Sequence, residues 1–265
     1  MTKLKFIPRR QILTAVASAT LTVLTIAAWG ADIPVPNGSF ESQSGAGQPF
    51  GVNVLVDSWQ KPPNPGYPES SSFMWVQSAG VFVGTSPSSP NPYTNLQGTQ
   101  AAYVLGLPGA GLFQDDQTTD WSGSMTGLSA TYQVGLGYQF TLGVFGKGMP
   151  ENSASLQLSL YYRDGANRTT IGSPTTITFN STTFNPAGPF TLIDYSVVVP
   201  TVQAADAWAG KNIGISILAA TGDGNGYWDM DNARLTSFVP EPSVSSLIAL
   251  GAGAFFLVRR RSQRG

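Results

Sequence analysis

The stretch of sequence that decides the fold contains YQFTLGVF (residues 138–145) and SLQLSLYY (residues 155–162). Both segments alternate in polarity with a period of two residues, which is the period of a β-strand with one buried face. Leu156, Leu158 and Leu160 would therefore lie on the same face of their strand. The pair Asp164-Gly165 that follows is a tight-turn signal. This stretch predicts antiparallel strands.

Similar short runs occur on both sides of this stretch. We predict further strands at residues 51–56, 73–76, 81–83, 101–105, 175–179, 191–199, 213–218 and 227–235. Gly, Pro, Asn and Ser separate these runs, and Pro-rich segments at 60–72 and 85–97 indicate two long loops. No long segment between residues 33 and 238 has the 3.6-residue period of a helix. The pattern predicts an all-β, antiparallel β-sandwich over residues 31–238.

The composition limits the chemistry that the chain can perform. The 265 residues include no Cys and no His, and only 11% are charged. Disulfides, Ser-His-Asp and Cys-His catalytic arrangements and zinc sites with His or Cys ligands are therefore excluded. Glycoside hydrolysis by two carboxylates remains chemically possible. No sequence feature indicates which two of the candidate residues would act together; the candidates are Glu41, Glu69, Glu151, Asp115 and Asp116. We predict that the protein is not an enzyme.

The first 30 residues have the layout of a signal peptide. Lys3, Lys5, Arg9 and Arg10 precede an apolar stretch at 12–29, and a small-residue site permits cleavage after Gly30. The Arg pair resembles a twin-arginine export motif but also occurs in general signals, so the choice of export machinery stays open. A retained membrane helix is the alternative to cleavage.

Three features follow one another in the last 27 residues, 239–265. The motif Val239, Pro240, Glu241, Pro242 precedes an apolar run at 243–258, and the run ends at the basic cluster Arg259, Arg260, Arg261. As a transmembrane helix the run would span about 24 Å, against about 30 Å for a bilayer core, with its basic end in the cytoplasm. A plain single-pass anchor is one interpretation of this tail.

Together the three features resemble the PEP-CTERM sorting signal that exosortases recognise. Exosortases are membrane proteases of Gram-negative bacteria that make exopolysaccharide. The resemblance implies an exosortase-like protease as a partner and a precursor anchored in the inner membrane. It also implies a mature protein in the cell envelope, at the cell surface or in the extracellular matrix of a biofilm.

The exported region is acidic. Residues 31–242 contain six basic residues and all 15 acidic residues, so the net charge of this region is 6 minus 15, or −9. Nucleic acid is excluded as a partner because phosphate binding needs clustered Lys and Arg. The charge is compatible with cations and neutral polymers.

Short motifs along the exported region resemble the galactose-binding-like jelly roll of many carbohydrate-binding modules. They are NGSFE (37–41), GTQAAY (98–103), GKNIGI (210–215) and YWDMDNARL (227–235). In these jelly rolls an early acidic residue and an aspartate of the last strand surround a structural calcium ion. The matching positions are Glu41 and Asp231, with Asp229 as a further metal ligand on the same strand face. Alternatively, Asp231 braces backbone amides and no ion binds.

Aromatic side chains in or near the predicted loops are candidates for carbohydrate binding, because sugar rings pack against aromatic faces. These residues are Trp59, Tyr67, Trp75, Tyr93 and Trp121. Packing in the core or anchoring of loops is the alternative for each of them. We expect a non-catalytic module that binds carbohydrate or associates with exopolysaccharide. The competing hypothesis is a structural or adhesive surface protein without a defined small ligand.

Overall fold

The computed structural model describes residues 30–42, 52–84, 93–120, 122–185, 187 and 189–239. Gly30–Val239 forms one compact unit. Apart from Gly30 and Val239, the predicted signal peptide and the PEP-CTERM tail with its transmembrane helix lie outside the described residues. Within the described ranges, no helix has the length and apolar character needed to cross a membrane.

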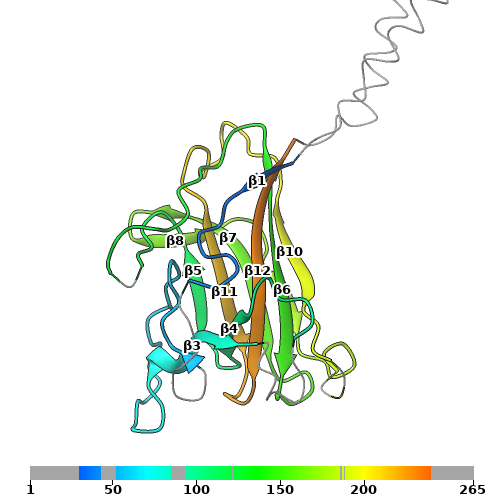
Figure 1. Ribbon diagram of the computed structural model, residues 1–265. Helices are drawn as coiled ribbons and strands as arrows, with labels where there is room; N and C mark the ends of the chain where they lie inside the picture. Colours follow the sequence, from blue (N-terminus) through cyan, green and yellow to red (C-terminus); the bar gives the residue numbers. More distant parts are fainter. Residues whose placement is uncertain are drawn as a thin grey trace, which may run out of the picture. The chain divides into compact units, whose positions relative to one another are not determined.

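Two antiparallel sheets form the sandwich (Figure 1). The larger sheet has the spatial order β10 (Ile193–Val199), β6 (Gly137–Lys147), β12 (Tyr227–Phe238), β4 (Gln100–Leu105), β3 (Ala79–Val83), β2 (Val52–Asn53), and β1 (Ala31–Ile33) also pairs with β12. The smaller sheet has the order β5 (Gly111–Gln114), β11 (Gly214–Thr221), β7 (Ser155–Asp164), β8 (Asn167–Thr170), and β9 (Thr175–Thr178) also pairs with β7.

The pairing of eight of these strands is that of a jelly roll. These eight strands run from β4 to β12 without the short β8. The first of them, β4, pairs with the last, β12. The next pairs are β5 with β11, β6 with β10, and β7 with β9 in the middle. This nested order is the double Greek key of a jelly roll, and the predicted all-β, antiparallel sandwich is confirmed.

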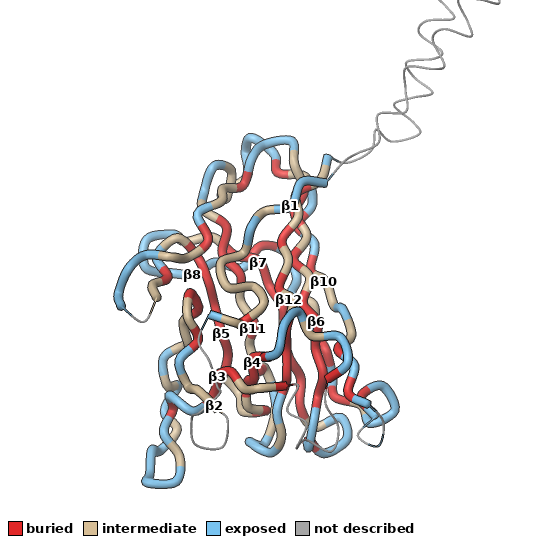
Figure 2. The backbone as a smooth tube through the Cα atoms, viewed as in Figure 1, coloured by how far each residue is buried: buried red, intermediate tan, exposed pale blue. Residues whose placement is uncertain are grey.

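The core lies between the two sheets and follows the period of two. Leu156, Leu158 and Leu160 are fully buried, as predicted, and they face buried side chains of the larger sheet such as Trp228 and Met230. Buried residues follow the strands, whereas exposed residues concentrate in the loops at the two ends (Figure 2). The alternating pattern therefore did predict which side chains form the core.

One predicted strand, at residues 73–76, is wrong. The segment leads into a 3-10 turn, η2 (Trp75–Ser78), where the Gln77 side chain accepts a hydrogen bond from the Met74 N–H at 2.7 Å. The sequence also did not predict β1, β5 and β8. The four residues of β8 are polar and exposed, so no apolar alternation marks that strand.

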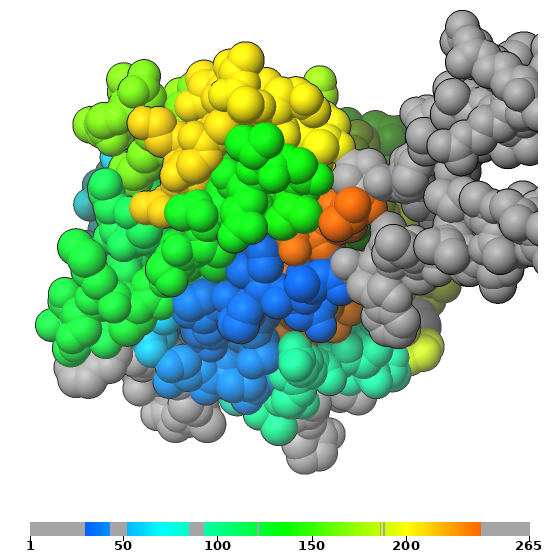
Figure 3. Space-filling model, turned by 90° about the horizontal axis from the view of Figure 1, so that it is seen from above, coloured from blue at the N-terminus to red at the C-terminus, as the bar shows by residue number. Residues whose placement is uncertain are grey.

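The N-terminal segment runs alongside β12, where the Ala233 N–H donates to the Gly38 carbonyl oxygen at 2.8 Å, and it then turns sharply. Asn37 and Phe40 have positive φ angles of 48° and 55°, and the Phe40 ring is buried 5.4 Å from that of Trp59. Seen from above, this blue segment lies directly beside the orange end of β12 (Figure 3). Its turn places Glu41 next to the start of β4.

Candidate functional site

Strand β12 directs an acidic residue away from the core. Trp228 and Met230 point into the sandwich and are fully buried, so Asp229 between them faces the outer side of the larger sheet. Its cross-strand neighbours are Tyr103 on β4 and Phe145 on β6. Two loops cover this part of the sheet, and Asp229 is only 6% exposed.

Asp229 is held in a nearly water-free environment. The hydroxyl of Tyr93 donates a hydrogen bond to its Oδ2 atom at 2.5 Å. Burial raises the pKa of Asp229 to about 6, while the Tyr93 hydrogen bond and the charge of Lys147 act in the opposite direction. Burial, and then the charge of Asp229, raise the pKa of Tyr93. Burial therefore favours the protonated form of Asp229 relative to that of an exposed aspartate.

Aromatic rings enclose this carboxyl group. The ring centroid of Tyr93 lies 5.8 Å from that of Phe145 and 5.4 Å from that of Phe190, and Phe145 and Phe190 are 4.8 Å apart. The ammonium group of Lys147 lies 4.6 Å from the centroid of Phe190. We call Asp229, Tyr93, Phe145, Phe190 and Lys147 the Asp229 site.

The two loops that carry Tyr93 and Phe190 are tied to each other. The Asn95 amide donates to the Leu192 carbonyl oxygen at 3.0 Å, and its Oδ1 accepts from the Leu192 N–H at 2.9 Å. A backbone bond of 3.1 Å from Thr94 N–H to the Phe190 carbonyl adds to this connection. The covering side chains of the Asp229 site are therefore positioned as one unit.

A pair of carboxylates, Glu41 and Asp231, lies where the N-terminal segment meets β4. Oε1 of Glu41 accepts from the N–H groups of Thr99 and Gln100 at 2.8 and 2.7 Å. Asp231, which is fully buried, accepts from the N–H of Gln97 and from that of Asn232, both at 2.6 Å. Burial raises the pKa of Asp231 to about 7, the two backbone hydrogen bonds lower it, and the nearby charge of Glu41 raises it further.

The structure thus brings Glu41 and Asp231 together but directs Asp229 to Tyr93. No group of three or more His, Cys, Asp and Glu residues is arranged for a metal ion among the residues that the structure describes. In this arrangement Asp231 accepts hydrogen bonds from two backbone N–H groups.

The aromatic residues predicted to bind carbohydrate are distributed over different places. The Trp59 indole N–H donates to the Asn37 carbonyl, and that of Trp75 donates to the Pro62 carbonyl at 2.8 Å. Tyr67 stacks on Trp75 at 5.6 Å, and Tyr93 belongs to the Asp229 site. Trp121 lies outside the described residues. Trp59 and Trp75 are buried anchors of their loops.

The carboxylates nominated for glycoside hydrolysis have separate local partners. Glu69 accepts from the Trp75 N–H and Glu151 from the Ser181 N–H. Asp115 forms an ion pair with Arg163 at 2.8 Å, and Asp116 accepts from the Asn212 amide. Each of these side chains therefore has a structural role of its own.

No protein-family model matches this sequence, and no curated protein matches it. Solved structures do match. A cyclase from Fischerella sp. TAU is similar at a TM-score of 0.56 and 19% identity, over 81% of this chain and 100% of the cyclase. A Fischerella sp. TAU cyclase in complex with 4-(1H-indol-3-yl)butan-2-one has a TM-score of 0.53 and 20% identity, over 80% and 100%. A xylan-binding domain of Paenibacillus barcinonensis Xyn10C is similar only at a TM-score of 0.33 and 10% identity, over 62% and 83%.

The similarity to the cyclases corrects one prediction. We expected a protein without enzymatic activity because the chain has no His and no Cys. That expectation is wrong, since over most of its length the chain has the fold of proteins that are catalytic. Sequence reasoning treated Asp229 only as a metal ligand. An acidic residue between the core residues Trp228 and Met230 lies on the outer face of its strand, and no local signal shows that loops distant in the sequence cover it.

Proposed function

We propose that the protein is an enzyme in which Asp229 acts as a general acid on a small aromatic substrate. The observation that supports this proposal is the buried carboxyl group of Asp229, hydrogen-bonded to Tyr93 and enclosed by aromatic rings. A general acid is most effective when its pKa lies near the working pH, and burial moves the pKa of Asp229 to about 6. Aromatic faces stabilise a positive charge that forms on the substrate after protonation.

The aromatic rings also indicate the kind of substrate. The rings of Tyr93, Phe145 and Phe190 pack on one another and are at most 7% exposed, so a substrate would reach Asp229 only after the loops that carry Tyr93 and Phe190 move aside. A flat, electron-rich ring would then pack favourably on these aromatic faces. The cyclases with a similar fold include one in complex with an indole compound. An indole ring combines these properties, since it is flat and accepts a proton at carbon.

Hydrogen exchange into indole tests the proposal without knowledge of the natural substrate. In D₂O, the carboxyl group of Asp229 would transfer a deuteron to C3 of indole, so that an O–D bond breaks and a C–D bond forms. The C3–H bond then breaks and its proton returns to the carboxylate. We expect the full-length chain to accelerate loss of the C3 proton signal in NMR spectra, and Asp229→Asn to abolish the acceleration.

Asp194→Asn is the matched control, because Asp194 is an exposed carboxylate whose side chain is 58% accessible. This variant should exchange indole as fast as the unsubstituted chain. Equal rates for the unsubstituted chain and Asp229→Asn would refute the role of Asp229.

We also propose that the protein is exported and sorted by an exosortase-like protease to the envelope or extracellular matrix. The ordered basic, apolar and small-residue parts of 1–30 and the Pro-Glu-Pro tail at 239–265 support this. Expression with and without an exosortase gene tests it by mass spectrometry of the C-terminus. We expect cleavage near Glu241 only with exosortase, and none in Glu241→Ala. Identical C-termini in all samples would contradict it.

A structural calcium ion at Glu41 and Asp231 is a further proposal. Burial is the main cause of the raised pKa of Asp231, and the charge of Glu41 adds to it; a divalent cation would relieve the repulsion between the two carboxylates. We expect calcium to raise the melting temperature of the full-length chain by several degrees relative to EDTA. Asp231→Asn should remove the difference. The same melting temperature in calcium and EDTA would rule the ion out.

A further inference from the structure

Two arginines lie directly opposite each other on the outer face of the smaller sheet. Arg163 of β7 and Arg168 of β8 are cross-strand partners, so their side chains are neighbours on the same face. Leu158 and Leu160 of β7 are buried in the core, and Arg163 therefore points outward. Like charges placed directly opposite each other destabilise a sheet. The region 31–242 has only six basic residues, so the pairing of two of them calls for a reason.

A buried carboxylate balances one of the two positive charges. The Nε atom of Arg163 lies 2.8 Å from Oδ2 of Asp115, which is 1% exposed. The same Oδ2 accepts a hydrogen bond from the Tyr161 hydroxyl at 2.5 Å, and Oδ1 accepts one from the Gln117 N–H at 2.9 Å. Arg168 forms no ion pair with any residue that the structure describes. Two positive charges and one negative charge leave a net charge of +1 at this place.

An aromatic ring holds the guanidinium group of Arg168 in position. Its Cζ atom lies over the ring of Phe113, 3.8 Å from the centroid, and 6.0 Å from the centroid of Tyr161. The N–H groups of a guanidinium lie in its plane, so stacking on a ring leaves them available at the edge. A side chain that is already fixed loses less conformational entropy when a ligand binds.

Arg163 adds donors at the same place. Asp115 takes its Nε–H, whereas the two terminal nitrogen atoms of Arg163 donate to no other residue within the described part of the chain. Arg168 is exposed, and the side chain of Arg163 is 18% exposed. A ligand from solvent can therefore contact both guanidinium groups.

The charge and the donor geometry of this face select an anion of limited charge. A guanidinium group presents two parallel N–H donors that match the two oxygen atoms of a carboxylate. One carboxylate balances the net charge of +1, whereas a phosphate with two negative charges would leave an excess charge beside Asp115. The net charge of −9 on residues 31–242 repels long polyanions. The two arginines repel cations.

We propose that Arg163 and Arg168 bind the carboxylate group of a small organic acid. Arg168 donates two hydrogen bonds to it, and a terminal nitrogen of Arg163 donates a third. The Glu side chain of an acidic peptide offers the same chemistry, so the experiment includes such a peptide. This site lies on the smaller sheet and Asp229 on the larger one, so the proposal is independent of the proposed catalysis.

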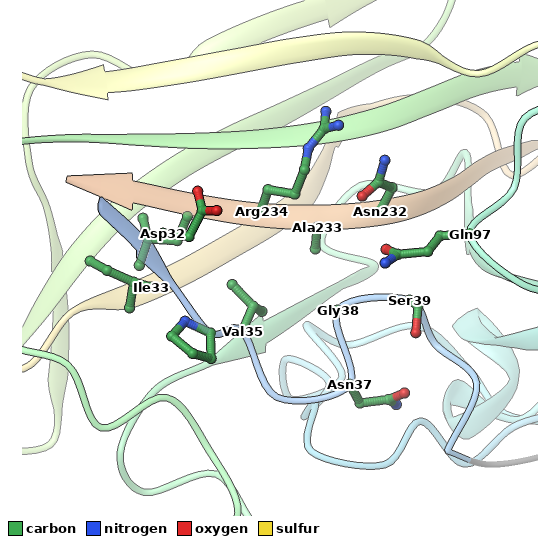
Figure 4. Close-up of a pocket in the computed structure, with 12 residues that line it drawn as sticks. Asp32, Ile33, Val35, Asn37, Gly38, Ser39, Gln97, Asn232, Ala233 and Arg234 are labelled. Atoms are coloured by element: carbon green, nitrogen blue, oxygen red, sulfur yellow. The ribbon is translucent and has the colours of Figure 1, made fainter. Parts of the chain in front are cut away.

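NMR spectroscopy of the full-length chain, with its arginines labelled with ¹⁵N, tests the proposal. The probes are acetate, glutarate, a tri-glutamate peptide and inorganic phosphate, at constant ionic strength and in an uncharged detergent. The Nε–H signal of Arg163 reports binding, and Arg168→Gln is the test variant. Arg234→Gln is the matched control. Arg234 belongs to the larger sheet, projects to the other side of β12 from Ala233 (Figure 4) and is paired with Asp194 at 2.6 Å.

We expect acetate and glutarate to shift the Arg163 signal in a saturable manner, with equal dissociation constants for the unsubstituted chain and Arg234→Gln. In Arg168→Gln the dissociation constants should rise about tenfold, because two charge-assisted hydrogen bonds are lost. Equal dissociation constants for Arg168→Gln and the unsubstituted chain would overturn the proposal, as would the absence of a saturable shift.

The other two probes test the identity of the ligand. Acetate and glutarate should bind more tightly than phosphate, and phosphate that binds more tightly than every carboxylate would overturn the assignment. Tri-glutamate should bind no more than about threefold more tightly than glutarate, as expected from its larger number of carboxylates. A much higher affinity for tri-glutamate would refute a small acid as the ligand and assign the site to an acidic peptide.

Discussion

The hydrogen bond between Tyr93 and Asp229 can be measured by a double-mutant cycle. At pH 8, well above the pKa of about 6, Asp229 is ionised, and the Tyr93 hydroxyl stabilises a buried charge at 2.5 Å. A hydrogen bond to a charged group contributes about 1.5–3 kcal/mol, whereas a neutral one contributes about 1 kcal/mol. We therefore expect Tyr93→Phe to lower the free energy of unfolding by about 2–3 kcal/mol in the unsubstituted chain.

In the Asp229→Asn background the same substitution removes a hydrogen bond between neutral groups. Its cost should fall to about 1 kcal/mol, which gives a coupling energy of about 1–2 kcal/mol. Equilibrium unfolding in urea, followed by near-UV circular dichroism, measures all four proteins. Tyr132→Phe is the control, since its buried hydroxyl donates to the Tyr161 carbonyl at 3.1 Å. Its cost should be the same in both backgrounds.

The result that would refute this reasoning is a cost of Tyr93→Phe that is equal, within about 0.5 kcal/mol, in both backgrounds. The Tyr93 hydroxyl would then not stabilise the ionised carboxylate of Asp229. The structural basis for a poised acid in the Asp229 site would be lost with it.

Three further predictions concern stability. Gly98→Ala should lower the free energy of unfolding, measured in urea, by about 2 kcal/mol or more. Gly98 has a φ of 109°, and a Cβ atom added there would lie 2.5 Å from Oε1 of Glu41. Burial lowers the pKa of Lys61 from 10.5 to about 8, so between these pH values the unfolded chain binds more protons than the folded one. The free energy of unfolding of the unsubstituted chain, relative to Lys61→Met, should therefore rise by up to about 3 kcal/mol from pH 8 to 10.5. Asp115→Asn should cost about 2–3 kcal/mol in the same assay, because Arg163 is only 18% exposed and would lose its counter-charge.

Each of these predictions has a control and an opposite outcome. Gly123→Ala should cost about 1 kcal/mol, because φ is positive there but no atom lies within 4 Å of the added methyl. Asp194→Asn breaks an exposed ion pair with Arg234 and should cost less than about 1 kcal/mol. Costs equal to these controls would contradict the first and third predictions. A stability difference independent of pH would contradict the second.

Much of the fold could be predicted from local pattern, because burial of one sheet face imposes a period of two residues. The segments 138–145 and 155–162 lie within β6 and β7, and the buried leucines of β7 are those that the alternation selected. The errors have local causes. In the segment 73–76, the Met74 N–H donates to the Gln77 side chain and not to a neighbouring strand. The four residues of β8 are all exposed, so no apolar alternation marks this strand.

The candidate site could be predicted only in part. The resemblance to jelly rolls did bring Glu41 and Asp231 together, and their backbone partners at 97–100 lie in one of the motifs or next to it. It did not show that Asp229 would be enclosed by Phe145 and Phe190. The missing His and Cys led to the conclusion that catalysis was absent. One buried carboxyl group is enough for proton transfer, so that conclusion did not follow from composition.

The sequence by itself determined the strand pattern, the acidic charge of residues 31–242 and the chemistry that missing residues exclude, because these depend on residue type and on neighbours along the chain. Only the tertiary structure decided that Asp229 and Asp231, two residues apart on one strand, have different roles. Asp229 meets Tyr93 across 136 residues of sequence, and Asp231 meets Gln97 across 134. The pKa and the role of a buried carboxylate depend on such partners and on exclusion of water, and the chain acquires both only when loops distant in the sequence fold over the outer face of the larger sheet.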